Sequence, residues 1–393
     1  MPGRPASPST ARAINDRLAL RLLQQEGPLT AGQLKQLTGL SRPSVADLVE
    51  RLAAAGLIHV VGESGEQRRG PNARLYGIVA DQAHLAALDV RTEGVSVLVS
   101  DLLGRVLAEA SVTVGGDTGT GPAVERAVAL VERAAKEAGV PELHTVAIGA
   151  PGLIDPATGE LRDSGGLPEW HRRLVLALQE RLPKTRIHVE NETNLAALAE
   201  QRDGAARDRD TFVLLWLGHG TGAAVVLDGT LRRGASGGTG EIGFLPVPGT
   251  VGLPSAVDCE GGFHSLAGSA AIVRLAERHG PAVGADGHEP PAARVVREAV
   301  TGGSADFLDA LADRLAIGVA SVVAILDPGC LVLGGEVGQA GGADLAARVE
   351  SRVRRMSPLA TEVRASTLGG EAVLRGALLT ARDRAQDDLF APR

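Results

Sequence analysis

The stretch Gly234-Ala-Ser-Gly-Gly-Thr-Gly-Glu-Ile-Gly243 is the segment of this 393-residue sequence that is most specific for one fold. Just before it, residues 214–220 and 222–231 have the pattern of strands joined by a glycine turn, and residues 85–107 repeat that pattern. An architecture that recurs over a long period predicts a duplicated α/β unit. The cleft between two such halves is a typical place for a small molecule to bind.

Alternating helices and strands are predicted after each of these strand-turn-strand segments. Apolar residues at helical spacing, and short apolar runs between them, mark the elements. Helices are expected over 121–138, 169–182, 193–206, 265–279 and 305–325, and strands over 143–149, 185–189 and 330–334. We therefore expect a two-lobed α/β body over 81–393, with lobes of roughly 81–205 and 206–393.

The first 80 residues follow a different pattern. Residues 1–13 are expected to be disordered, and a first helix is predicted over 14–26 because its apolar residues share one helical face. That face consists of Ile14, Leu18, Leu22 and Leu23. Thr30 is expected to cap a second helix, whose Leu34 and Leu37 face inward before a tight turn at Gly39.

A third helix is predicted from Ser41 to Gly56, with apolar residues at core spacing from Val45 to Leu52. Two short helices across a glycine-containing turn are typical of a helix-turn-helix, whose second helix enters the major groove of DNA by its N-terminus. The sequence therefore predicts DNA contacts at the polar start of this helix, at Ser41, Arg42, Pro43 and Ser44.

Two strands are expected after the helices, over 57–61 and 74–79. Helices followed by such a hairpin predict a winged helix-turn-helix over 14–80. The polar loop between these strands contains Arg68, Arg69 and Gly70, and a basic wing suits the DNA backbone or the minor groove. The alternative is a small helical module that binds proteins, with solvated charges in that loop.

Charge and composition limit the class of protein and its expected partners. Residues 1–80 carry a net charge of +4 and the remainder −11, as expected for a DNA-binding head on an acidic body. Two cysteines, Cys259 and Cys330, are too few for a disulfide scaffold or a thiolate zinc cluster. The sequence contains neither an apolar run of about 18 residues nor the apolar core of a signal peptide, which predicts a cytoplasmic protein without membrane contact.

The body resembles the ROK (repressor, open reading frame, kinase) family, and the head resembles the winged helix of that family's repressor branch. The resemblance in the head includes Gly39-Leu-Ser-Arg-Pro-Ser-Val45. The body motifs, in the family's order, are Gly149-Ala-Pro-Gly-Leu-Ile-Asp155, Val189-Glu-Asn-Glu-Thr-Asn194, Leu217-Gly-His-Gly-Thr-Gly222, Gly234–Gly243 and Leu326-Asp-Pro through Leu333-Gly-Gly335. This resemblance implies a two-lobed actin/hexokinase-like fold.

Two departures from the family's kinases predict that the chain is not an enzyme and needs no cofactor. The family's catalytic Asp, in a Glu-Asn-Asp sequence, corresponds to Glu192 in Glu190-Asn191-Glu192. The first phosphate loop, Asp-x-Gly-x-Thr in the kinases, reads Asp89-Val-Arg-Thr-Glu93, so it lacks its glycine and presents an acid to a polyanion. The second glycine loop, Gly218–Gly222, and the Gly334-Gly335 pair are retained.

The resemblance also bears on metal and ligand sites. The zinc-binding His of the family corresponds to Phe244, and the cysteine cluster region 255–264 holds one cysteine and one histidine, so no metal is expected. Asn191, Glu192, Glu241 and His264 are the expected ligand-binding residues, with His264 in place of a family Glu. The alternative is a relic pocket whose polar residues only satisfy one another.

The sequence as a whole predicts a DNA-binding transcriptional regulator, a repressor, whose degenerate sugar-kinase-like body senses a small molecule such as a sugar. Its expected partners are operator DNA, the effector and further copies of itself, as a homodimer or homotetramer that reads two half-sites. An active ATP-dependent sugar kinase with an accessory DNA-binding head, and a ligand-independent DNA-binding scaffold, are the alternatives.

Overall fold

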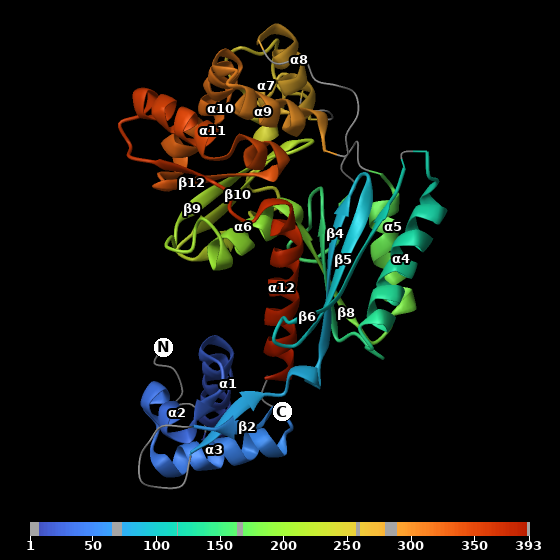
Figure 1. Ribbon diagram of the computed structural model, residues 1–393, viewed down its shortest axis with the longest axis vertical. Helices are drawn as coiled ribbons and strands as arrows, with labels where there is room; N and C mark the ends of the chain where they lie inside the picture. The colour runs from blue at the N-terminus through green and yellow to red at the C-terminus, as the bar shows by residue number, and fades with distance from the viewer. Residues whose placement is uncertain are drawn as a thin grey trace.

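The chain folds into a small head and two α/β lobes (Figure 1). The computed structural model describes residues 8–64, 73–115, 117–162, 168–256, 260–279 and 289–390, with side chains from residue 11 onward. We call residues 8–79 the head, residues 84–203 together with the C-terminal helix lobe I, and residues 212–365 lobe II. Each lobe is built around a five-stranded sheet.

The head has three helices and a three-stranded sheet of order β1-β3-β2, the arrangement of a winged helix. Its elements are α1 (Pro8–Glu26), β1 (Leu29–Thr30), α2 (Ala31–Thr38), α3 (Arg42–Ala54), β2 (Ile58–Glu63) and β3 (Arg74–Ile78).

Local side-chain chemistry fixes the helix ends of the head as the sequence predicts. The Thr30 hydroxyl accepts a hydrogen bond from the Gln33 N–H at 3.2 Å, and the Gln33 side chain accepts one from the Thr30 N–H at 2.9 Å, which completes a capping box. Ser41 caps α3 by accepting from the Ser44 N–H at 3.3 Å. Gly39 and Gly56 have φ of 70°, the left-handed conformation that ends a helix.

Three expectations about the head are wrong. The first helix begins at Pro8, so it includes residues that were expected to be disordered. Its buried face is Ala19, Leu20 and Leu23, whereas Ile14 is 59% exposed. Leu37 of α2 is likewise half exposed. Apolar spacing identified a helix correctly, but in so small a core the closest-packed positions include an alanine, which a search for large apolar residues does not count.

Lobe I is a mixed sheet of order β6-β5-β4-β7-β8 with helices on both faces. Its strands are β4 (His84–Arg91), β5 (Gly94–Asp101), β6 (Val106–Thr113), β7 (Thr145–Ala150) and β8 (Arg186–Asn191). Helices α4 (Thr120–Glu137) and α5 (Trp170–Arg181) cover one face, and α6 (Glu192–Asp203) and α12 (Ala372–Leu389) lie on the other (Figure 1).

Lobe II repeats the strand arrangement of lobe I, with the order β11-β10-β9-β12-β13. In both sheets a meander of three antiparallel strands is extended by two parallel strands, which confirms the predicted duplication. The strands are β9 (Phe212–Leu217), β10 (Thr221–Leu227), β11 (Thr230–Arg232), β12 (Cys330–Gly334) and β13 (Glu362–Ala365); the helices are α7 (His264–Ala267), α8 (Ser269–His279), α9 (Pro291–Gly302), α10 (Ala305–Leu326) and α11 (Gly335–Met356).

The predicted helix 265–279 is interrupted at Gly268. This residue has an extended backbone, with ψ of 158°, and separates α7 from α8. A side chain at Gly268 would place its Cβ 2.8 Å from the His264 carbonyl oxygen. The close approach explains why glycine occupies the break.

The C-terminal helix does not follow the predicted division into lobes of 81–205 and 206–393. α12 leaves lobe II and packs against β4, β7 and α6 of lobe I (Figure 1). The approach of α12 to α6 is close enough that a Cβ on Gly376 would lie 1.9 Å from the Leu195 carbonyl oxygen. Sequence order therefore assigned this helix to the wrong lobe.

None of the described helices is long and apolar enough to cross a membrane. Cys330 is a buried free thiol in β12, whereas Cys259 lies outside the described residues.

The glycines of the Gly234–Gly243 stretch allow its backbone to touch two other segments. Gly237 has φ of 81°, and a Cβ there would lie 1.9 Å from the Ile154 carbonyl oxygen of lobe I. Gly240 has φ of 89°, and its Cβ would lie 1.8 Å from the Ala223 carbonyl oxygen of β10. Glycine is therefore needed at Gly237 and Gly240 for two reasons: the backbone is left-handed there, and a side chain would clash with the neighbouring carbonyl.

We predict that Gly240→Ala destabilises the protein far more than Gly249→Ala. Both glycines have φ of 89°, but nothing lies within 4 Å of a Cβ at Gly249. The control variant carries only backbone strain, about 1 kcal/mol, whereas Gly240→Ala adds a clash with backbone that we expect to cost about 2 kcal/mol more. Denaturant unfolding of both variants measures the difference, and equal free energies of unfolding would contradict the close approach.

Candidate functional site

The start of α3 presents an exposed polar surface on the head. Ser41, Arg42, Pro43 and Ser44 are all exposed, while Val45 on the next position is buried. Arg42 forms no hydrogen bond or ion pair with another described residue, so its guanidinium is available to a ligand. A free cation at the N-terminus of an exposed helix is suited to phosphate and base contacts.

The predicted wing contacts Arg68, Arg69 and Gly70 lie outside the described residues. The strands β2 and β3 that flank them pair as predicted. Arg51, farther along α3, has a structural role, because it pairs with Asp16 of α1 at 2.6 Å and with Asp47. Of the arginines on α3, Arg42 is therefore the one that faces outward without a partner among the described residues.

A second polar site lies between the lobes, where the start of α6 meets the second glycine loop. A Cβ on Gly222 of that loop would lie 3.5 Å from the Thr193 hydroxyl in the first turn of α6. Lobe II approaches the same place through Arg233, whose Nε donates to Glu190 at 2.6 Å. Four of the sequence motifs, 149–155, 189–194, 217–222 and 234–243, thus meet at one junction between the lobes, which we call the cleft.

Asn191 holds this junction together through backbone groups. Its Oδ1 accepts hydrogen bonds from the N–H groups of Thr193 at 2.9 Å and Asn194 at 3.3 Å and so caps α6. Its Nδ2 donates to the Gly152 carbonyl at 3.1 Å. Both ends of the predicted ligand-binding side chain are therefore already engaged.

Glu192 has the unsatisfied carboxylate of the cleft. Its Oε2 is buried and has no hydrogen-bond partner in the structure. Burial raises the pKa of Glu192 to about 8, and the nearby carboxylates of Asp89, Glu241 and Glu336 add to the rise. At neutral pH the Glu192 carboxyl is protonated in most molecules, so it can donate a hydrogen bond as well as accept one.

The other two predicted residues lie at the lobe II side of the cleft. Glu241 is exposed, although the surrounding protein desolvates its carboxyl enough to raise its pKa. His264 is half buried beside Gly243, and burial lowers the pKa of its imidazole. Asn191, Glu192 and Glu241 thus lie close together at the cleft, and His264 lies at its edge.

A charged cluster that the sequence analysis missed crosses the cleft. Arg91 donates to Asp89 at 2.8 Å and to Glu336 of α11 at 2.8 Å. The sequence identified the loss of a glycine at 89–93, but it gave no sign that the replacing arginine pairs with a residue 245 positions away. The spacing of an arginine two positions after an aspartate on one strand face was an available signal for the Asp89 pair alone.

The described residues contain no group of three or more His, Cys, Asp and Glu side chains placed to hold a metal ion. Phe244, where the family's zinc-binding His is expected, ends a short 3₁₀ turn, and Cys259 is outside the described residues. The absence of a zinc site stays a prediction.

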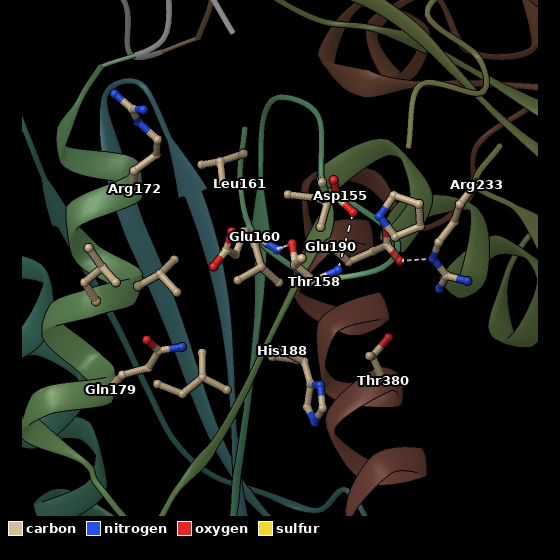
Figure 2. A pocket seen from close by; sticks show the side chains of 18 of the residues that line it. Asp155, Thr158, Glu160, Leu161, Arg172, Gln179, His188, Glu190, Arg233 and Thr380 are labelled. Carbon is tan, nitrogen blue, oxygen red and sulfur yellow. Dashed lines mark hydrogen bonds and ion pairs between the residues drawn. The ribbon is translucent and has the colours of Figure 1, made fainter. Parts of the chain in front are cut away.

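A pocket of about 840 Å³ opens beside the edge strand β8, between α5 and α12 (Figure 2). Its lining includes Asp155, Glu160, Arg172 and His188, and it contains none of the four predicted ligand-binding residues. The pocket shares Glu190 and Arg233 with the interlobe junction, where the Arg233–Glu190 ion pair forms part of its lining.

Comparison with known protein families gives two matches along the chain. The sequence model of the ROK family matches residues 86–384, and that of the MarR family matches residues 14–70. The first covers both lobes, and the second covers the head up to the loop after β2.

Known regulators are among the similar sequences. The DNA-binding transcriptional dual regulator NagC of Escherichia coli K12 is 28% identical over 248 residues, which are 60% of this chain and 58% of that protein. The match thus spans less than two thirds of the E. coli regulator. The xylose repressor of Caldicellulosiruptor bescii is 23% identical over 337 residues, which are 82% of this chain and 83% of that protein.

Solved structures extend the similarity to the whole fold. A ROK family transcriptional regulator, described as a homologue of the E. coli MLC protein, superposes with a TM-score of 0.77 at 22% identity and covers 97% of this chain and 98% of its own. A ROK hexokinase from Thermus thermophilus has a TM-score of 0.61 at 29% identity over 77% of this chain and 99% of its own. Because the family model matches well over half of its residues, this chain belongs to the ROK family.

Proposed function

We propose that this chain is a DNA-binding transcriptional repressor that responds to a sugar or sugar derivative and does not phosphorylate it. The observation that carries the proposal is the joining of a winged helix with an exposed Arg42 to a sugar-kinase-like body whose cleft is crossed by Arg91. The xylose repressor, which is similar over most of both chains, supports the same function. A homodimer or homotetramer is part of the proposal, because one recognition helix reads few base pairs.

The charges of the cleft argue against ATP as a substrate. Four carboxyl groups, those of Asp89, Glu192, Glu241 and Glu336, act on one another there. Arg91 is already paired with two of them. Phosphoryl transfer needs cations and backbone N–H groups around the triphosphate, whereas this cleft presents negative charge to it.

A neutral polyhydroxy ligand fits the same groups. The Oε2 atom of Glu192 lacks a partner, and the exposed Glu241 carboxylate can accept hydroxyl hydrogen bonds. Asn191, Glu192, Glu241 and His264 are accordingly proposed as the effector site, with Asn191 acting mainly through the backbone that it holds.

We expect Arg42→Ala to weaken specific DNA binding by about 1–3 kcal/mol and to relax the sequence preference. The operator is first selected from genomic fragments with the full chain, and the affinity is then titrated at two salt concentrations. Arg133→Ala removes an exposed arginine of lobe I and is the matched control, which we expect to bind like the parent. Equal affinities for all three proteins would show that α3 is not the recognition helix.

The cleft should bind a sugar without turning it over. In a thermal-shift series with xylose, glucose and N-acetylglucosamine, we expect at least one sugar to raise the melting temperature and Glu241→Ala to remove the rise. ATP with Mg²⁺ should give no shift and no sugar-dependent hydrolysis. Turnover near 1 s⁻¹, an ordinary kinase rate, would establish the enzyme alternative instead.

Stability should depend on pH through Glu192. In the unfolded chain this carboxyl ionises near its ordinary pKa of 4.5, whereas the folded protein keeps it protonated up to about 8. The unfolded state therefore releases its proton first, and the free energy of unfolding falls as pH rises from 4.5 to 8.

We expect Glu192→Gln to remove this dependence. At pH 5 the variant and the parent should have similar stability, and by pH 8.5 the variant should be the more stable by roughly 2–5 kcal/mol, because each pKa unit corresponds to about 1.4 kcal/mol. Urea unfolding at three pH values measures the difference. Parallel stability curves for the two proteins would mean that Glu192 is ionised in the native state.

A further inference from the structure

Arg91 connects three segments that are far apart in the sequence. Its Nε donates to Asp89 in β4, one terminal nitrogen donates to Glu336 in the first turn of α11, and the other donates to the Gly370 carbonyl at 3.4 Å, just before α12. The first partner belongs to lobe I and the second to lobe II. This side chain therefore bridges the two lobes across the cleft.

Each carboxylate partner of Arg91 is firmly held by its own lobe. Asp89 is 4% exposed within the central strand β4. Glu336 packs on Gly218 of the glycine loop, because a Cβ there would lie 2.7 Å from Glu336 Oε2. Its neighbour Gly335 is pressed against β9, where a Cβ would lie 2.4 Å from the Leu217 carbonyl oxygen. Breaking the bridge therefore needs movement of a lobe, since neither carboxylate can follow the arginine far.

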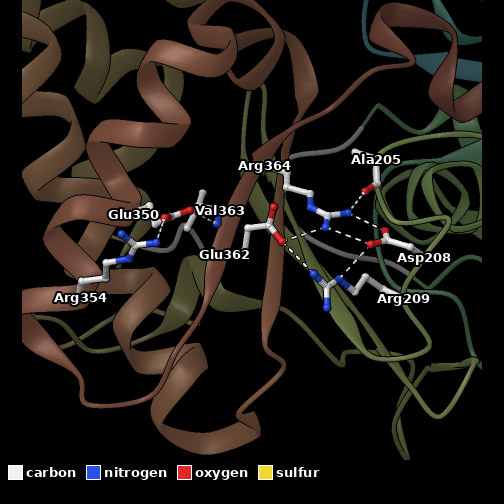
Figure 3. Close-up of polar contacts among 8 residues, drawn as sticks. All are labelled: Ala205, Asp208, Arg209, Glu350, Arg354, Glu362, Val363 and Arg364. Atoms are coloured by element: carbon white, nitrogen blue, oxygen red, sulfur yellow. Dashed lines mark hydrogen bonds and ion pairs between the residues drawn. The ribbon is translucent and has the colours of Figure 1, made fainter.

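The chain crosses between the lobes at two places, and ion pairs link the first crossing to the end of β13, where the second crossing begins (Figure 3). α6 leads into β9 through residues 204–211, and β13 leads into α12 through residues 366–371. Arg364 of β13 donates to the Ala205 carbonyl and to Asp208 on the first crossing, both at 2.6 Å. The Arg364 pairing lowers the pKa of Asp208 to about 2, so this tie persists at any physiological pH.

A second tie between the crossings is buried. Glu200 near the end of α6 is fully buried and accepts hydrogen bonds from the Ala205 N–H at 2.6 Å and from the Ser366 hydroxyl. The two crossings are thus linked over a short distance, as in a hinge, whereas Arg91 and Glu336 lie at the cleft, near the opposite end of α6.

The head is joined to lobe I by a continuous core. Leu20 and Leu23 of α1 belong to the same buried cluster as Leu85 of lobe I and Phe390 after α12, and this cluster continues into the sheet of lobe II. Arg17 of α1 forms an ion pair with Asp387 at the end of α12. The connection is therefore packed, whereas a free linker would leave apolar side chains exposed on both sides.

We propose that Arg91 and Glu336 form a latch that holds the lobes closed without a ligand, and that residues 204–209 and 362–366 form the hinge. When the latch breaks, lobe II rotates as one body against a second body that consists of the head and lobe I. The latch can open because Arg91 is 42% exposed and its pair with Glu336 competes with water. The motion takes place within one chain and requires neither DNA nor a sugar.

The test compares the full chain with Glu336→Gln and Arg91→Gln by small-angle X-ray scattering and amide hydrogen exchange. We expect both variants to have a larger radius of gyration than the parent, because the lobes open. Amide exchange at 204–209 and 362–366 should be faster by about threefold or more, although neither segment touches the substituted residues. Exchange in α1 should stay unchanged, because the head moves together with lobe I.

Glu289→Gln provides the control, because it removes an ion pair with Arg297 on the surface of lobe II and should leave both measurements unchanged. Unchanged scattering in both latch variants would overturn the latch, and faster exchange in α1 would overturn the single body of head and lobe I. Should either variant fail to fold, Arg91→Lys keeps the charge but cannot reach both carboxylates, and the same opening is expected of it.

Discussion

The packing of α6 and α12 against each other, between the two sheets, is the interaction on which the remaining structure depends. Leu195 and Ala196 of α6 and Ala377 and Ala381 of α12 lie in one buried cluster that continues into both sheets and the head. Small residues bring the helices together closely enough that the backbones nearly touch at Gly376. Because this helix pair contacts both sheets and, through the ion pair of Asp387 with Arg17, the head, it sets where the cleft lies relative to the DNA-binding surface.

The chemistry of the cleft follows from an excess of acid over base. Carboxyl groups enter from β4, α6, the Gly234–Gly243 stretch and α11, and among the described residues Arg91 is the cation that pairs with two of them. An acidic site disfavours a polyanion and instead suits a neutral ligand rich in hydroxyl groups. Burial is the main reason why the pKa of Glu192 is raised so far above the ordinary value for a glutamic acid, and the neighbouring carboxylates add to the rise.

Features that depend on neighbouring residues could be predicted from the sequence, while features that depend on distant residues could not. The caps at Thr30 and Ser41 are local, and the duplicated sheets follow from repeated apolar runs. The sheet against which α12 packs could not be predicted, because an apolar stripe shows that one face of a helix is buried but not which sheet covers it. The Arg91–Glu336 pair likewise depends on folding, since its two residues belong to separate lobes.

The shared core of head and lobe I constrains how the proposed regulator can respond to its ligand. A ligand shifts an equilibrium only through different affinities for two arrangements, so some part of the molecule must move when the cleft is filled. The ion pair between Arg17 and Asp387, together with the buried cluster that includes Leu20 and Phe390, restricts independent movement of the head. The difference between the two arrangements must therefore lie in the position of lobe II. In an oligomer assembled through lobe II, such a rotation would change the separation of two heads, and hence their fit to two half-sites.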